Sequence, residues 1–181
     1  MRALQYIIDA LTSMYLLLLM LRLVFPYMRV NFRSPLAQAI MRLTSPPVVP
    51  LRRILPPVGR VDTATLLVAL VIQAAAVTLI VLLHGVTPIP LAVALTTIIK
   101  LVVLFIHLFA FAVIIRVVLS WVAPHQHNPA TEIVNSISDP VLAPFRRLIP
   151  SIGGMDISPV FVIVGLMALG ILIGDLAPYR I

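Results

Sequence analysis

The chain has 181 residues, of which 61% are hydrophobic and only 10% are charged, and its mean hydropathy is +1.14. So little polar surface cannot cover a soluble globule, so the composition excludes a soluble domain and indicates an integral membrane protein. The chain contains no cysteine, which excludes disulfides and thiolate metal or nucleophile sites. The formal net charge of +7 lies in turns beside apolar segments, a pattern typical of membrane topology signals and not of nucleic-acid binding.

Four apolar runs have the length of membrane-spanning helices, which need about twenty residues. We expect these spans at about residues 4–25, 63–83, 97–122 and 159–176. The third lies in a run from Leu91 to Val122 that is longer than one crossing requires, so we expect it to tilt or to project beyond the bilayer. In the fourth, Gly170 and Gly174 form a GxxxG pair, which permits close approach of another helix.

A few polar side chains interrupt these spans. Asp9 and Arg22 lie near the ends of the first span, where we expect them to anchor the helix, Arg22 by extending its guanidinium to the membrane surface. We expect Lys100 to extend in the same way towards the loop that precedes the third span. Gln73 and His107 lie deeper. For both we expect contacts between helices, with a substrate ligand (Gln73) or a proton or cofactor site (His107) as the alternative.

One segment occurs twice, and its two copies define the organisation of the chain. Residues Ser34–Asp62 recur without a gap as Asn128–Asp156, 94 positions further on. The repeated positions carry proline, glycine and charge, which indicates that a backbone shape is duplicated. We therefore expect two repeats, residues 1–87 and 88–181, each with two spans. The matched pairs are Pro35/Pro129, Pro46/Pro140, Pro50/Pro144, Arg52/Arg146, Arg53/Arg147, Pro56/Pro150, Gly59/Gly153 and Asp62/Asp156.

Each copy begins with the pattern of a short amphipathic helix. Ser34 and Asn128 are suited to the N-cap, and each precedes a proline, which fits the first helical position. Apolar residues follow at helical spacing, so we expect one stripe to face the apolar side in both copies. About ten residues cannot span a bilayer, and we expect Pro46 and Pro140 to end helices that lie flat at the membrane surface. The stripes are Leu36, Ala39, Ile40 and Leu43, and Ala130, Ile133, Val134 and Ile137.

A basic turn follows each amphipathic helix. It carries two arginines between apolar residues, which places a pair of cations at the height of the lipid headgroups. A proline and a glycine then turn the chain back, and Asp62 and Asp156 are placed to cap the next span and to complement its dipole. We expect the four arginines to bind anionic phosphates; the alternative is that they only set the topology. They are Arg52, Arg53, Arg146 and Arg147.

Motifs for catalysis, phosphate binding and metal ligation are missing from the sequence. His125, His127 and Glu132 lie close along the chain, but the i, i+2 spacing puts the two histidines on different sides of a helix. There is no glycine-rich phosphate loop, nucleophile elbow or HExxH helix. We therefore expect no enzyme, no cofactor and no bound metal.

The doubled signature resembles that of the YggT family of small integral membrane proteins, which are found in bacteria and plastids. It reads PxxxPLRRxLPPxGxxD in the first copy and PxxxPFRRLIPxxGGxD in the second. The resemblance covers nearly the whole chain and implies no catalytic residues. The associations suggested for the family are osmotic or potassium homeostasis, septum placement and cell division in bacteria, and cytochrome b6 haem attachment or nucleoid distribution in plastids.

The repeat also predicts a topology. Two crossings in each repeat place both proline-rich loops on one side of the membrane, with the repeats related by a pseudo-two-fold axis along the membrane normal. Most arginines lie in these loops, so the positive-inside rule makes the loops cytoplasmic and both termini external. We expect the protein in the bacterial cytoplasmic (inner) membrane.

Two functions of different classes follow from these features. The first is a non-enzymatic membrane organiser or assembly factor, whose amphipathic helices and basic turns bind anionic lipid headgroups, other membrane proteins or a second copy of the chain. The alternative is a small transport or channel component, which requires the intramembrane polar residues to converge on one path. Those residues are Asp9, Gln73, Lys100 and His107.

Overall fold

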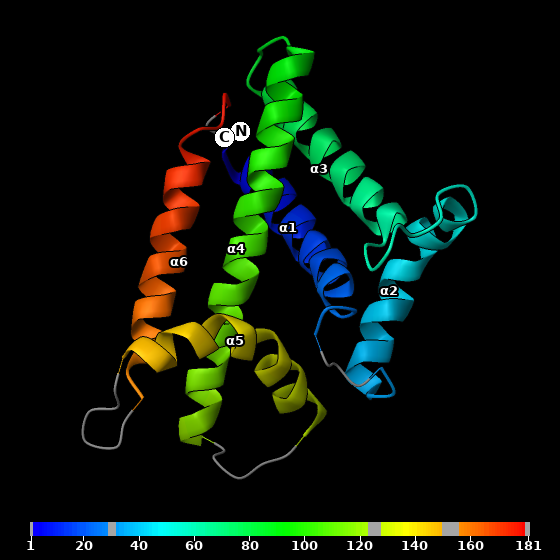
Figure 1. Cartoon of the computed structure of the whole chain (residues 1–181). Coiled ribbons are helices and arrows are strands. Elements are labelled where there is room, and N and C mark those ends of the chain that lie inside the picture. Colours follow the sequence, from blue (N-terminus) through cyan, green and yellow to red (C-terminus); the bar gives the residue numbers. More distant parts are fainter. Residues whose placement is uncertain (1, 29–31, 123–127, 150–155, 180–181) are drawn as a thin grey trace.

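A computed structural model of the chain describes residues 2–28, 32–122, 128–149 and 156–179. The described chain consists of six α-helices joined by short connections (Figure 1), which confirms the all-α prediction. Three of them, α1, α3 and α4, are long and apolar enough to cross a membrane, and α6 is apolar but shorter, with 17 residues. The helices are α1 (Arg2–Val24), α2 (Pro35–Arg52), α3 (Thr63–Leu83), α4 (Pro90–Val122), α5 (Pro129–Leu148) and α6 (Ser158–Gly174).

The order of apolar helix, amphipathic helix and apolar helix occurs twice along the chain. Helix α1 packs against α3, α4 packs against α6, and the two pairs meet where α1 and α3 contact α4. In Figure 1 the start of α1 and the end of α6 lie at one end of the long helices, while α2 and α5 lie towards the other end. The two copies of the repeated segment are therefore on the same side of the molecule.

The buried core joins the two repeats. Its largest cluster contains residues from α1 to α5, and Leu16, Leu19 and Phe25 at its centre are fully buried. A smaller cluster joins Val113 of α4 to Leu142 of α5 and to α6. Outside these clusters, the long helices expose many large apolar side chains, which suits surfaces that contact lipid tails.

Helix α4 is longer than one crossing requires, as the sequence predicts. Its length of 33 residues corresponds to about 50 Å at a rise of about 1.5 Å per residue, whereas a hydrocarbon core is about 30 Å thick. Part of α4 therefore extends beyond the hydrocarbon, and in Figure 1 its last turns pass α5.

The amphipathic helices are longer than predicted, and the prediction that Pro46 and Pro140 end them is wrong. A proline removes one backbone hydrogen bond and bends a helix, but the helix continues when packing holds both halves in place. Here Val48 and Leu142 lie between prolines and are fully buried. These signature prolines are therefore inside helices and do not form turns. They are Pro46 and Pro50, with Pro47, in α2, and Pro140 and Pro144 in α5.

The buried side of α2 also differs from the predicted stripe. Leu36 and Leu43 are 43% and 59% exposed, so most of that stripe faces away from the protein. Helical periodicity marks an apolar face, but it does not distinguish a face that contacts lipid from one that contacts protein. The orientation of the predicted stripes towards the apolar side of the membrane thus stays a prediction, and the exposure of Leu36 and Leu43 is compatible with it. The buried residues are Ala37, Ile40, Thr44 and Val48 in α2, and Ile133, Ile137, Ser138 and Leu142 in α5.

The contact between α4 and α6 depends on one glycine of the GxxxG pair. A Cβ atom at Gly170 would lie 3.0 Å from Nε2 of His107, which is closer than ordinary contact. At Gly174 the nearest neighbour of such an atom would be Val103, at 3.9 Å. Only Gly170 is therefore needed for the close approach of the two helices.

We expect Gly170→Val to lower the stability of the protein by about 1–3 kcal/mol, because the added side chain overlaps the His107 imidazole. Gly165→Val is the matched control, since it makes the same chemical change on the same helix where nothing lies within 4 Å. Thermal unfolding of both variants in one detergent measures the difference. Equal unfolding temperatures would contradict the close contact.

Candidate functional site

Arg22, near the end of α1, lies in a buried polar cluster. Its side chain is 2% exposed, and its Nη1 donates hydrogen bonds to Thr44 Oγ1 at 2.9 Å and Ser45 Oγ at 3.3 Å, both on α2. Its Nε lies 3.5 Å from Oδ2 of Asp62, which also accepts a hydrogen bond from Arg52. This first arginine cluster ties together α1, α2 and the start of α3. The prediction that Arg22 extends to the membrane surface is therefore wrong.

The second repeat builds a similar cluster from the equivalent positions. Nη1 of Arg116 donates to Ser138 Oγ on α5 at 2.9 Å and to the carboxylate of Asp139. Arg146 donates from Nε to Asp156 at 2.7 Å, and its Nη1 lies 3.8 Å from Asp139. This second arginine cluster ties together α4, α5 and the segment that precedes α6. Each of its five members lies 94 positions after its counterpart in the first cluster.

The two clusters differ in charge and in burial. Asp139 occupies the position of Ser45, so the first cluster has two arginines and one aspartate, whereas the second has two of each. The single carboxylate of the first cluster, Asp62, is 7% exposed, whereas Asp156 is 39% exposed. The first cluster therefore depends on one buried carboxylate that pairs with two guanidinium groups and leaves one positive charge uncompensated.

Both aspartates remain ionised because their partners outweigh the effect of burial. Burial raises the pKa of the Asp62 carboxyl, but hydrogen bonds from Thr65 and Arg52 hold that pKa below its usual range. Burial also raises the pKa of Asp156, and its hydrogen bond from Arg146 again outweighs this and lowers the pKa. Both carboxylates therefore carry a negative charge at neutral pH, as pairing with arginine requires.

The turn between α2 and α3 is a tight reversal. Val58 and Val61 exchange two backbone hydrogen bonds of 3.1 Å, and Gly59 between them has φ +62°, a conformation that favours glycine. Pro56 precedes this reversal, and its carbonyl accepts a hydrogen bond from Thr63 Oγ1 at 2.9 Å. Proline and glycine thus turn the chain here, as the sequence predicts.

Three of the four predicted helix caps are present. Asp62 is the N-cap residue of α3, and Ser34 and Asn128 are the N-cap residues of α2 and α5, each followed by proline in the first turn. Asp156 lies one residue further from its helix, and its carboxylate accepts a hydrogen bond from the backbone N–H of Ser158 at 3.0 Å. Pro150 and Gly153 lie outside the described residues.

The four signature arginines have two different environments. Arg52 and Arg146 belong to the arginine clusters, where aspartates neutralise them. Arg53 and Arg147 are exposed, and no ion pair joins either of them to another residue in the part of the chain that the structure describes. The binding of anionic phosphates thus stays a prediction, and it applies best to Arg53 and Arg147.

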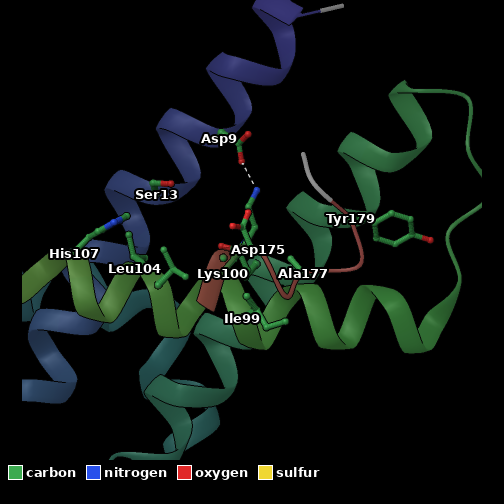
Figure 2. Close-up of a pocket in the computed structure, with 12 residues that line it drawn as sticks. Asp9, Ser13, Ile99, Lys100, Leu104, His107, Asp175, Ala177 and Tyr179 are labelled. Carbon is green, nitrogen blue, oxygen red and sulfur yellow. Dashed lines mark hydrogen bonds and ion pairs between the residues drawn. The ribbon is translucent and has the colours of Figure 1, made fainter. Parts of the chain in front are cut away.

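The intramembrane polar residues line one cavity of about 460 Å³ between α1, α3, α4 and α6 (Figure 2). Gln73, the central residue of α3, is buried at its wall, and His107 lines it from the middle of α4. Asp9 and Lys100 line it nearer to the end of the bundle where α1 starts. The cavity therefore reaches from that end towards the middle of the long helices. Its other lining residues are Ser13, Ile99, Val103, Leu104, Gly174, Asp175, Ala177 and Tyr179.

Asp9 and Lys100 form an ion pair in this cavity. Lys100 Nζ donates to Asp9 Oδ1 at 3.0 Å, the contact marked by the dashed line in Figure 2. The side chains of Lys100 and Asp9 are 25% and 31% exposed. The prediction that Lys100 extends towards the preceding loop is wrong, because a carboxylate on α1 offers its ammonium group a partner inside the bundle.

The segment after α6 attaches beside the cavity. The hydroxyl of Tyr179 accepts a hydrogen bond from the backbone N–H of Ile89 at 2.9 Å, and its own backbone N–H donates to Thr96 Oγ1 at 3.2 Å. These bonds fix the chain after α6 to the start of α4, so Ala177 and Tyr179 complete the cavity wall. Sequence reasoning missed this segment, because it carries no motif and lies about 90 residues from its partners.

Equivalent positions of the two repeats meet in the cavity. Asp9 and Val103 are 94 positions apart and both line it, and the same holds for Ser13 and His107. The cavity therefore lies where the repeats meet, around the pseudo-two-fold axis that relates them. Binding sites of repeat-built transporters are found in this kind of location. Sequence reasoning did not name Ser13 as a site residue. The repeat offset could have identified it, because Ser13 occupies the position in the first repeat that His107 has in the second.

Metal ligation finds no support in the described part of the chain. No group of three or more His, Cys, Asp or Glu side chains there is placed to hold a metal ion. His125 and His127 lie outside the described residues.

Comparison with known protein families shows to which family the chain belongs. The model of the family described as CCB3/YggT matches residues 1–83 and 95–177, two segments that begin and end 94 positions apart. The chain belongs to the CCB3/YggT family. The two matches reproduce the repeat period of the sequence, and the apolar helices together with this membership identify an integral membrane protein.

Relatives in this family align with most of the chain. An uncharacterised protein of Pseudomonas aeruginosa is 42% identical over 170 residues, which cover 93% of this chain and 86% of that protein. A Vibrio alginolyticus protein is 31% identical over 178 residues, 97% of this chain and 96% of its own. The YggT protein of Escherichia coli K12 is 30% identical over 163 residues, 90% and 85% of the two chains. No solved structure matches the chain.

We expect Asp62→Asn to destabilise this YggT-family protein by about 3 kcal/mol, because the change leaves the buried Arg22 without a compensating charge. Asparagine preserves the capping ability of the side chain, so the loss isolates the charge. Asp156→Asn is the matched control at the exposed equivalent position, and its cost should be about 0–1 kcal/mol. Unfolding of both variants in mixed detergent micelles measures the two losses. A larger loss for Asp156→Asn would contradict the central role of Asp62.

Proposed function

We propose that this protein binds a small polar solute or ion in the cavity between its repeats and is a component of membrane transport. The observation that supports this proposal is the convergence of Asp9, Gln73, Lys100 and His107 on one cavity. Sequence reasoning favoured a membrane organiser and made this convergence the condition for transport. Charged groups inside a bilayer are costly, so a cavity that collects them is a functional candidate by default.

The position of the cavity supports the same proposal. Asp9 and Lys100 lie towards the end of the bundle, and Ser13, Gln73 and His107 lie deeper, which is the order expected for a path that leads from water to the middle of a membrane. At its inner end, His107 meets the backbone of α6 at Gly170. A shift of α6 against α4 would therefore change the depth of the cavity, so these two helices of the second repeat are the natural moving parts.

The proposal includes a topology with four spans. The 17-residue helix α6 serves as the fourth span, because it pairs with α4 as α3 pairs with α1. The side of α2 and α5 carries most of the arginines, so it faces the cytoplasm, and the cavity opens to the external side of the bacterial inner membrane. The protein acts without a catalytic step and without a cofactor.

A second candidate function, the membrane organiser, is supported by the exposed arginines. Arg53 and Arg147 lie beside Ile54 and Leu148, whose side chains are 76% and 79% exposed. A cation beside an exposed apolar group suits a surface that inserts into the headgroup layer of an anionic membrane, where each cation contributes on the order of 1 kcal/mol. Partner membrane proteins or a second copy of the chain would dock on this same face.

We expect a cysteine placed at Ser13 to react with a small, membrane-impermeant thiol reagent, because water reaches the cavity and allows the thiolate to form. Met14→Cys is the matched control, since Met14 is the next residue on α1, is 62% exposed and lies outside the cavity. The natural chain has no cysteine, so each variant carries a single thiol. Labelling of intact cells and of inverted vesicles also reports the side on which the cavity opens.

The labelling experiment has clear opposing outcomes. Fast reaction of Ser13→Cys from outside, with slow reaction of Met14→Cys, supports a water-filled external cavity. Equal slow reaction of both variants from either side would contradict it. Reaction of Ser13→Cys only in inverted vesicles would preserve the cavity and reverse the topology.

A genetic comparison separates the two candidate functions. We expect Gln73→Leu with His107→Leu to abolish rescue of a strain that lacks the gene, because both changes remove polar groups from the cavity. Arg53→Gln with Arg147→Gln should retain most of the rescue. Membrane insertion of each variant is measured first by protease protection. Rescue by the cavity variant and failure of the arginine variant would instead support the organiser.

A further inference from the structure

A negative and a positive side chain in the cavity already form an ion pair with each other. Asp9 comes from the first repeat and Lys100 from the second, and their atoms are 3.0 Å apart. Both side chains remain about one quarter to one third exposed and line the cavity. They are therefore accessible to a bound molecule and are not sealed inside the packed core.

We propose that the cavity binds a zwitterion with one ammonium and one carboxylate group, of the size of a neutral amino acid. This inference rests on the proposed solute-binding function and names its ligand class. The ammonium group of the ligand pairs with Asp9 and its carboxylate pairs with Lys100. The long, flexible stem of Lys100 permits the two side chains to separate and admit the ligand between them.

The reason for a zwitterion is that each simpler ligand leaves a charge unpaired. A cation that binds Asp9 displaces Lys100, and an anion that binds Lys100 displaces Asp9. An unpaired charge within the depth of a membrane is unfavourable, whereas a partner exchange that pairs both charges again avoids this cost. An uncharged solute gains nothing from the pair. Only a ligand with both charges replaces both contacts at once.

The other residues that line the cavity further restrict the class of ligand. Ile99, Val103 and Leu104 present apolar groups to the cavity, which suits an aliphatic side chain. The exposed Asp175 adds a second carboxylate to the lining, so a ligand with an additional negative charge is disfavoured. A volume of about 460 Å³ lies within the range of small-molecule sites. These features favour neutral over acidic amino acids.

The test uses the full chain in nanodiscs of phosphatidylglycerol, whose headgroup has no ammonium group. The probes are six neutral amino acids: glycine, L-alanine, L-serine, L-valine, L-leucine and L-proline. Each probe that binds by calorimetry is compared with two analogues that lack one charge, which for L-alanine are ethylamine and propionate. We expect at least one amino acid to bind, with both of its analogues at least tenfold weaker.

Two variants test the residues. Asp9→Asn with Lys100→Met removes both charges together, so no charge is left unpaired and the protein should remain folded. This variant should bind the amino acid at least tenfold more weakly. Arg53→Gln, which changes an exposed residue outside the cavity, should bind it as the natural chain does. Thermal unfolding without ligand confirms that both variants are folded.

The outcomes separate this inference from the function on which it rests. Absence of binding by all six amino acids, or unchanged binding by the double variant, would overturn the proposal that the ligand is a zwitterion. Equal binding of ethylamine or propionate would overturn it as well, but it would leave a solute-binding cavity in place. Failure of Ser13→Cys to react with the aqueous reagent would instead remove the cavity function itself.

Discussion

The architecture of the first repeat depends on the contacts of one buried group, the guanidinium of Arg22. It joins hydroxyl groups of α2 to the carboxylate that caps α3, so three helices meet at one side chain. Arginine is suited to this task because its planar group offers several donors in fixed directions and cannot lose its charge. Arg116 has the corresponding position in the second repeat. The duplicated signature is therefore mainly a device for attaching a proline-bent helix to two long ones.

The two ends of the molecule differ in how similar the repeats are. At one end both repeats have matching arginine clusters, whereas at the other end their equivalent residues differ. The arginine clusters hold α2 and α5 at the end opposite the start of α1. The cavity lies towards the other end, where the repeats have different residues at equivalent positions, Asp9 against Val103 and Ser13 against His107. The repeated positions thus stabilise the fold, and the positions that differ supply the chemistry of the candidate site.

The sequence was sufficient for the helices, the repeat and the caps, because each depends on local patterns. Apolar length predicts α1, α3 and α4, and the residue types at Ser34, Asp62 and Asn128 predict the caps of α2, α3 and α5. It was not sufficient for pairing between distant residues. Arg22 and Lys100 both looked like surface anchors, since the presence of Asp62 or Asp9 beside them follows from packing and not from spacing.

The prediction that Pro46 and Pro140 end their helices was wrong for a related reason. A proline ends a helix only when nothing holds the continuation, and the burial of Val48 and Leu142 is a tertiary property. Most of the α2 stripe faces away from the protein, because a bilayer accepts apolar side chains on the outer face of a protein. In water the same stripe would have marked the core. The sequence did not predict the cavity itself. It gave only the condition that a transport function requires four polar residues to converge.

The fusion of both repeats into one polypeptide has an evolutionary consequence. If an ancestral half-molecule formed a symmetric dimer, any substitution on the dimer axis would have appeared twice, once in each subunit. A carboxylate at position 9 would then have faced another carboxylate, and an imidazole at the position shared by Ser13 and His107 would have faced a second imidazole. A single chain that contains both halves has no such restriction. One polypeptide can therefore carry an axial site whose two sides have different, complementary groups, as Asp9 and Lys100 are here.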